Sequence, residues 1–185
     1  MRNTKSKQIK AKNLVLIALF AVLIAVCSWI SIPTAIPTTM QTFAVFLSLN
    51  FLGAKKGIVS ICIYLMLGLI GLPVFANFNS GIGALMNITG GYMIGWIFAG
   101  GVIWILERWL GRKLWVQAVS MLSGLIVCYL TGTAWFMIIG LQSGNGYQVW
   151  TALMWCVLPF LLPDMIKLGL AVWISERLRR ILKQG

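Results

Sequence analysis

The chain has 185 residues, of which 60% are hydrophobic and only 10% are charged, and its net charge is +12. A soluble domain carries roughly 25% charged residues, so this composition, with a mean hydropathy of +0.93, excludes a water-soluble globular protein. The basic residues recur in short clusters between apolar runs rather than on one face, which argues against nucleic-acid binding.

Apolar runs occupy most of the chain, and we expect each to be a membrane-spanning helix because lipid offers no partners for bare backbone groups. A spanning helix needs about 20 residues, so six helices and short connections use nearly the whole chain. The sequence therefore predicts a single all-α membrane domain over residues 1–185, although its second and third runs are short for a span. The runs are 14–31, 38–54, 57–73, 85–106, 115–140 and 149–175.

The first run follows a cluster of lysines, as the core of a signal peptide does, but it is longer than such a core, and we expect an uncleaved helix. Within it, Ala18, Ala21 and Ala25 form a stripe of small residues, and Gly91 and Gly95 form another in the fourth run. Small residues let helices approach closely. Packing inside the chain and docking of a partner subunit both fit these stripes.

The positions of the basic residues predict the orientation. Of the 15 lysines and arginines, 14 lie before the first run or after the second, fourth and sixth runs. The three other connections, near 32–37, 74–84 and 141–148, carry none. Because positively charged loops stay in the cytoplasm, we predict six spans in the cell membrane with both termini cytoplasmic.

The uncharged outer connections have a distinct composition. The connection near 74–84 places Phe75, Asn77, Phe78 and Asn79 close together. Aromatic rings beside amides suit a pocket for a flat small molecule with polar edges. Interfacial aromatic residues next to ordinary turn residues are the alternative interpretation.

Two ionisable residues lie within a predicted span, Asp164 and Lys167 in the sixth run. Their spacing places them on one helix face, and because charges are costly in lipid, both are expected to face the interior. They either bind a ligand or pair with each other to hold the bundle. Pro163 fits the first turn of a helix, so we expect the run to break there and restart. Because Asp164 lies about 20 Å of helix before Arg177, we expect it within reach of the outer loops, where Gln41 adds an amide.

The composition argues against an enzyme. The chain has no histidine, the commonest general base, and no second carboxylate within a span. Its four cysteines lie in apolar runs without a C-x-x-C pair, so we expect no metal and no cofactor. No phosphate-binding G-x-x-x-x-G-K-[ST] loop is present, so the chain cannot power transport with ATP by itself.

Four segments carry a resemblance to a known family: 36–42, 69–76 with G-L-P-V-F, 89–95 with T-G-G-Y, and 158–160 leading to Asp164 and Lys167. With these segments, the chain resembles the BioY family, the biotin-binding S components of energy-coupling factor vitamin transporters, over nearly its whole length. Two positions depart from the family's usual pattern: Ile88 stands where a proline usually precedes T-G-G-Y, and Pro163 stands where a glycine usually precedes the aspartate.

The resemblance implies capture of biotin from outside and delivery through a complex with a transmembrane scaffold subunit and two ATPase subunits. It also implies that the alanine stripe of the first helix docks on the scaffold. An S component for a different vitamin and a structural membrane protein without a ligand remain alternatives.

The chemistry of biotin is compatible with the polar residues of the chain. A carboxylate such as Asp164 can accept hydrogen bonds from the ureido N–H groups, and Asn79 can both donate and accept. Tyr92 and Phe75 can cover the ring, and Lys167 is the buried cation available for the carboxylate tail unless Asp164 takes that tail. The expected ligand-binding residues are Gln41, Phe75, Asn77, Asn79, Tyr92, Asp164 and Lys167.

Overall fold

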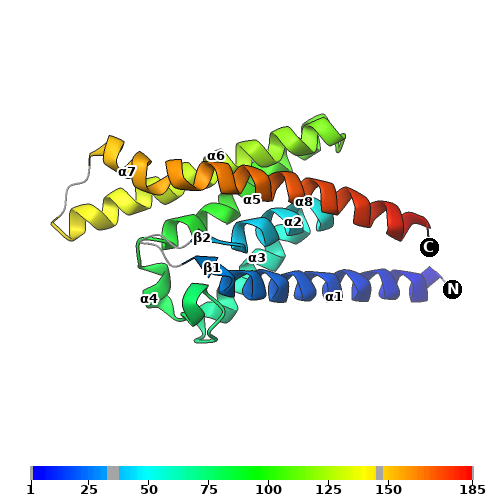
Figure 1. Cartoon of the computed structure of the whole chain (residues 1–185). Coiled ribbons are helices and arrows are strands. Elements are labelled where there is room, and N and C mark those ends of the chain that lie inside the picture. Colours follow the sequence, from blue (N-terminus) through cyan, green and yellow to red (C-terminus); the bar gives the residue numbers. More distant parts are fainter. Residues whose placement is uncertain (1, 33–37, 145–147, 185) are drawn as a thin grey trace.

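The computed structural model describes residues 2–32, 38–144 and 148–184, and within these ranges the chain is almost entirely helical (Figure 1). One hairpin of two-residue strands, in which Ser31 pairs with Thr39, joins the first two helices. The prediction of an all-α chain is confirmed. The elements are α1 (Arg2–Trp29), β1 (Ser31–Ile32), β2 (Thr38–Thr39), α2 (Gln41–Leu52), α3 (Ala54–Leu69), the 3-10 turn η1 (Ala76–Phe78), α4 (Ile82–Leu85), α5 (Gly90–Leu110), α6 (Leu114–Gln142), α7 (Val149–Cys156) and α8 (Leu158–Gln184).

Among the described helices, four are long and apolar enough to cross a membrane. They are α1 from Lys10 onward, α5, α6 and α8 up to Ile181. The other two predicted spans, α2 and α3, have only 12 and 16 residues, fewer than the roughly 20 that a span needs. A short helix is tolerated at membrane depth where protein surrounds it, and α2 is buried from Ala44 to Asn50 because α1, α3 and α8 pack around it. The count of six spans stays a prediction.

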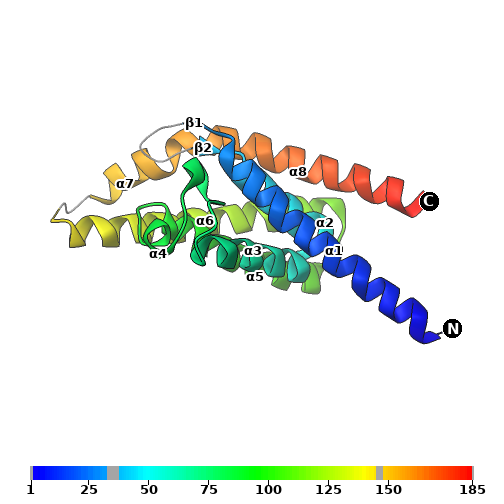
Figure 2. The same cartoon turned by 90° about the horizontal axis from the view of Figure 1, so that it is seen from below.

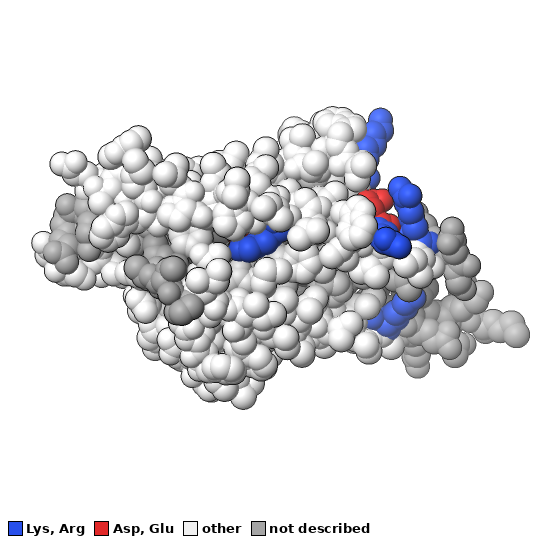
Figure 3. All heavy atoms as spheres, in the orientation of Figure 1, with Lys and Arg blue, Asp and Glu red and all other residues white. Residues whose placement is uncertain are grey.

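The two ends of the described chain lie at the same end of the molecule (Figures 1 and 2). Basic side chains also gather at this end on the face seen in Figure 3, and one further basic patch lies about midway along that face. We call this end, where α8 terminates and Arg112, Arg177 and Arg180 lie, the basic end. The arrangement agrees with an even number of crossings, whereas the assignment of the basic end to the cytoplasm stays a prediction from charge.

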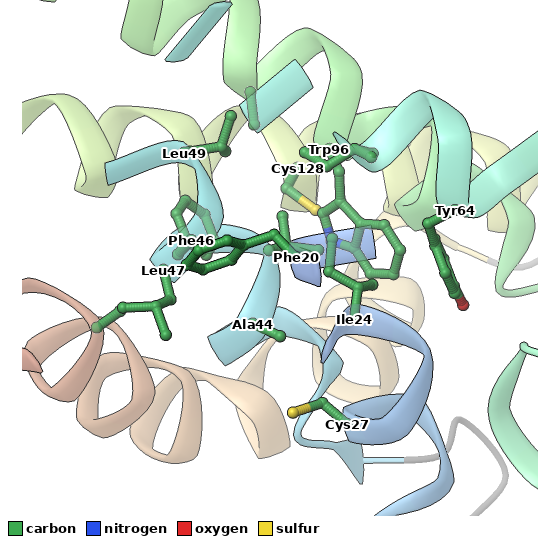
Figure 4. Packing of buried hydrophobic residues seen from close by; sticks show 14 of the residues in the cluster. Phe20, Ile24, Cys27, Ala44, Phe46, Leu47, Leu49, Tyr64, Trp96 and Cys128 are labelled. Atoms are coloured by element: carbon green, nitrogen blue, oxygen red, sulfur yellow. The ribbon is translucent and has the colours of Figure 1, made fainter. Parts of the chain in front are cut away.

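The core lies between α1, α2, α3, α5 and α6 (Figure 4). Phe20 of α1 and Phe46 of α2 are buried there, with Trp96 of α5 beside them. α5 and α6 approach so closely that a Cβ atom on Gly91 would lie 2.1 Å from the Cβ of Trp135, and one on Gly95 would lie 2.2 Å from Thr131 Oγ1. The glycine stripe therefore serves packing inside the chain.

The alanine stripe runs along the edge of the buried face of α1. Ala21 is 1% exposed and Ala25 is 6% exposed, and both pack into the core of the chain itself. Ala18 alone of the three is exposed. Neighbouring helices of the same chain cover Ala21 and Ala25, so Ala18 is the one of the three that is accessible to a partner in this structure, and docking at this stripe stays a prediction.

A polar network at the basic end ties α8 to segments far away in the sequence. The backbone carbonyl of Asn50, near the end of α2, accepts hydrogen bonds from Arg112, at 2.7 Å, and from Arg179 of α8. Gln117 of α6 donates to Glu176 of α8 at 3.1 Å, and Arg179 pairs with the same carboxylate oxygen at 3.1 Å. The network holds the ends of α2, α6 and α8 together.

Candidate ligand pocket

A pocket opens between α2, α5, α6 and α8, with β2 and η1 also contributing to its wall. Its empty space, including the open mouth, is about 660 Å³. Aromatic, hydroxyl-bearing and charged side chains all contribute, a mixture typical of small-molecule sites. The lining residues are Thr38, Thr39, Gln41, Thr42, Ala76, Thr89, Tyr92, Met93, Trp96, Leu125, Cys128, Tyr129, Phe160, Asp164 and Lys167.

Both ionisable residues singled out in the sixth run line this pocket. Lys167 Nζ lies 2.9 Å from Asp164 Oδ1, and the two residues are 7% and 5% exposed. Tyr129 of α6 donates its hydroxyl hydrogen to Asp164 Oδ2 at 2.9 Å. The sequence left open whether the charges pair with each other or face a ligand site, and the structure shows that they pair while lining the pocket.

The sixth apolar run breaks, but at Val157 rather than at Pro163, where the sequence predicted it. Pro159 lies in the first turn of α8, where backbone N–H groups have no acceptor within the helix. The missing N–H of proline therefore costs no hydrogen bond there. Pro163 lies inside α8. Because proline has no backbone N–H, the carbonyl of Pro159 receives no hydrogen bond from it. Two prolines four residues apart can each start a helix, and sequence alone did not distinguish them.

Tyr92 bridges this break from α5. The backbone N–H of Phe160 bonds to the carbonyl of Val157, so the carbonyl of Cys156 lacks its regular helical donor. The Tyr92 hydroxyl donates to that carbonyl at 2.9 Å. The hydroxyl thus holds the junction of α7 and α8, while the ring lines the pocket as expected.

Gln41, the first residue of α2, also lines the pocket and is 3% exposed. Its side-chain amide donates to the hydroxyl of Tyr64, which α3 holds fully buried. The contact fixes the orientation of the amide, so Gln41 presents a positioned polar group to the pocket wall.

The structure does not bring the predicted loop residues into the pocket. Phe75 is 1% exposed and packs edge-on against Tyr64, with ring centroids 5.6 Å apart. Asn77, at a positive φ of 57°, is exposed and accepts a hydrogen bond from Ser31 Oγ at 3.1 Å. Asn79 is exposed as well. From this loop, Ala76 lines the pocket instead, because the turn at Ala76–Phe78 directs Phe75 inward.

Sequence reasoning missed several lining residues. Tyr129, Trp96 and Phe160 lie in apolar runs, where a single aromatic residue gives no sign of the direction in which it points. The threonines at positions 38, 39 and 42 could have been predicted to line the pocket. Hydroxyl-bearing residues at the start of a predicted helix, next to Gln41, indicate a polar rim.

The arrangement presents a charged acceptor and a charged donor side by side in a wall of aromatic rings. The carboxylate of Asp164 retains acceptor capacity beyond its two contacts, because each oxygen has two lone pairs. Lys167 uses one of its three N–H donors on Asp164. The pocket can therefore both accept and donate charge-assisted hydrogen bonds at one point.

Comparison with known proteins identifies relatives over nearly the whole chain. The sequence profile of the BioY family matches residues 2–184. A Pyrococcus horikoshii protein named "Probable biotin transporter BioY" is 40% identical over 171 residues, which cover 92% of this chain and 98% of the relative. The "Biotin transporter BioY" of Thermotoga maritima is 36% identical and is covered to 97% of its length.

A solved structure agrees with this comparison. The S component for biotin from an ECF-type ABC transporter superposes with a TM-score of 0.83 at 28% sequence identity, covering 94% of this chain and 93% of the other. A second S component of a bacterial ECF transporter, at a TM-score of 0.51 and 16% identity, shares the fold.

Proposed function

This chain belongs to the BioY family, and we propose that it captures biotin in the pocket between α2, α5, α6 and α8 as the substrate-binding subunit of an ECF-type vitamin transporter. It is a membrane transport protein, not an enzyme. The observation that carries the proposal is the buried Asp164–Lys167 pair in the pocket wall, because intramembrane charges mark ligand sites and transport pathways.

We assign the ureido group of biotin, rather than its carboxylate tail, to the Asp164–Lys167 pair. A ureido group presents N–H donors next to a carbonyl acceptor, and the pair presents an acceptor and a donor 2.9 Å apart. The two sets are complementary at one point, and a neutral ureido group leaves the ion pair electrically balanced. A ligand carboxylate on Lys167 would instead leave the buried site with an excess negative charge, which is unfavourable.

The tail must then contact other groups, because the ureido group and the carboxylate lie at opposite ends of an extended biotin molecule. Gln41 and the threonines at positions 38, 39 and 42 form the remaining polar part of the pocket wall. Their amide and hydroxyl hydrogens can bond to a carboxylate. The rings of Tyr92, Trp96 and Phe160 supply the apolar surface for the bicyclic ring between the two polar ends.

Delivery into the cell requires partners, and we propose a transmembrane scaffold and two ATPase subunits, as the family resemblance implies. Ala18 is the member of the alanine stripe that remains available for docking on the scaffold. Next to it on α1 lie Val15, Leu19 and Val22, which are between 56% and 67% exposed. This apolar ridge suits contact with another membrane helix.

Calorimetric titration of the purified chain in detergent tests both the ligand and its orientation. Biotin is expected to bind with a nanomolar dissociation constant, about −12 kcal/mol. Biotinamide loses the tail's charge but keeps a carbonyl oxygen that can accept hydrogen bonds from Gln41 and the threonines, so it should bind at most about tenfold more weakly. 2-Iminobiotin carries a guanidine in place of the ureido group, and at neutral pH this guanidine is protonated. It should lose about 100-fold or more, because the protonated exocyclic nitrogen cannot accept from Lys167.

Each unfavourable result has a separate meaning. No heat with biotin but a clear signal with another vitamin would overturn the proposed ligand. Tight binding of biotin with a large loss for biotinamide and a small loss for 2-iminobiotin would overturn the orientation and place the tail at Lys167.

A further inference from the structure

A second hollow lies on the surface of α8 at the basic end, away from the ligand pocket. Trp173, Glu176, Arg177 and Arg180 line it, and its empty space, including the open side, is about 710 Å³. Trp173 is 57% exposed, and the guanidinium carbon of Arg177 lies 5.5 Å from the centroid of its ring. Such stacking holds the guanidinium group in place.

The charges of this hollow are unbalanced. Glu176 is engaged elsewhere, because its carboxylate accepts hydrogen bonds from Arg179 at 3.1 Å and from Gln117 at 3.1 Å. Within the described part of the chain, neither Arg177 nor Arg180 forms a salt bridge. The hollow therefore offers two guanidinium groups to an anion from outside the chain.

The helix face that leads to the hollow is apolar. Ile166, Leu170 and Trp173 are 58%, 42% and 57% exposed, and Arg177 and Arg180 continue the same face at spacings of four and three residues. The face thus changes from aliphatic to aromatic to cationic along α8. This order matches the change from hydrocarbon to interface to headgroup in a bilayer, where tryptophan is enriched at the interface.

We propose that this hollow binds the headgroup phosphate of an anionic phospholipid, with Arg177 and Arg180 on the phosphate and an acyl chain along Ile166 and Leu170. Guanidinium groups bind phosphate oxygens in a bidentate manner, and basic pockets beside membrane helices favour anionic headgroups. The apolar face that continues from the hollow favours a lipid over a free anion or an acidic protein. The inference does not depend on the ligand of the α2–α5–α6–α8 pocket.

Lipid titration followed by native mass spectrometry tests the proposal on the purified full chain. We compare phosphatidylglycerol with phosphatidylcholine of the same acyl chains, and expect tighter binding of the first lipid. The Arg177→Gln/Arg180→Gln variant should weaken phosphatidylglycerol binding by about 20- to 30-fold, from the attraction per basic residue near a headgroup. The matched control, Lys12→Gln/Lys113→Gln, removes two exposed charges elsewhere and should change it less than about twofold.

Other outcomes would overturn the inference. Equal binding of the two lipids by the unmodified chain would remove the anionic preference, and equal losses in both variants would show diffuse charge attraction instead of a site. Displacement of the lipid by millimolar inorganic phosphate would make the hollow a site for a free anion. Biotin affinity should stay unchanged in all variants, which confirms folding. If the double variant does not fold, Arg180→Gln alone, which leaves the stack of Arg177 on Trp173 intact, decides the question.

Discussion

Replacing Asp164 by Asn should lower both the stability of the folded protein and its affinity for biotin, and the two effects can be measured separately. The change keeps the size of the side chain but removes the negative charge that lies 2.9 Å from Lys167 Nζ. An amide oxygen can accept from Lys167 or from Tyr129, but the other amide position carries only donors. Either the ammonium group of Lys167 or the hydroxyl hydrogen of Tyr129 therefore loses its acceptor in a buried site.

The magnitude follows from the geometry of the pair. At 2.9 Å and an effective dielectric constant of about 20, two unit charges attract by about 6 kcal/mol. The partial compensation by the amide and by pocket water reduces the loss, and breaking a buried pair typically destabilises a protein by about 3–5 kcal/mol. The ligand loses a hydrogen bond to a charged group, which contributes about 1.5–3 kcal/mol, so biotin affinity should fall about 10- to 100-fold.

Thermal unfolding in detergent and calorimetry with biotin measure the two effects. Adding Lys167→Met to Asp164→Asn should restore most of the stability but not the affinity, because the stranded cation is gone while the ligand contacts stay lost. Glu176→Gln is the matched control, since Glu176 forms an i,i+3 pair with Arg179 on the same helix outside the pocket. It should leave biotin affinity unchanged. A stable Asp164→Asn protein with unchanged affinity would refute the reasoning for both roles.

Five further variants test the packing and the positions of the site residues. Tyr129→Phe removes the donor to Asp164 Oδ2 and should lower stability by about 1.5–3 kcal/mol and biotin affinity by about three- to tenfold; unchanged values in both calorimetry and unfolding would contradict the contact. Ala21→Trp should abolish folded protein because Ala21 is 1% exposed. Ala18→Trp should fold and bind biotin but reduce radiolabelled biotin uptake by the complex. Normal uptake would exclude docking at Ala18. Gly91→Ala should destabilise the chain by about 1–3 kcal/mol through the clash with Trp135. Gly101→Ala is the control: a Cβ there meets nothing within 4 Å, so the change should be neutral or stabilising by up to about 1 kcal/mol. Similar melting temperatures for the two variants would contradict the close approach of α5 and α6.

The sequence predicted those parts of the molecule that depend on hydrophobicity and charge. Apolar runs predicted the long helices α1, α5, α6 and α8, because lipid allows only helices that satisfy their own backbone. The energetic penalty of Asp164 and Lys167 in lipid predicted that both face the interior, and the structure places both in the pocket wall with Gln41 and Tyr92.

The remaining features depend on backbone geometry that the residue types do not specify. The positive φ angles of Asn77 and Phe78 direct the loop after α3, and nothing in the run of aromatic and amide residues indicates which of them turns inward. The depth of Ala21 depends on which helices surround α1, and a stripe of small residues looks the same on a buried face and on a docking face.

The spacing of the charge pair on α8 has a consequence for biogenesis. Asp164 and Lys167 lie three residues apart on one helix, a spacing that brings their side chains to the same face, and their charged atoms meet at 2.9 Å. A lone aspartate or lysine at the centre of a helix opposes insertion from the translocon by roughly 2.5–3.5 kcal/mol. Because the two charges can neutralise each other within a single turn, α8 can partition into lipid before its contacts with α2 and α6 exist. The pair can therefore lower the cost of inserting the nascent helix, and it lines the pocket only once the earlier helices have closed around it.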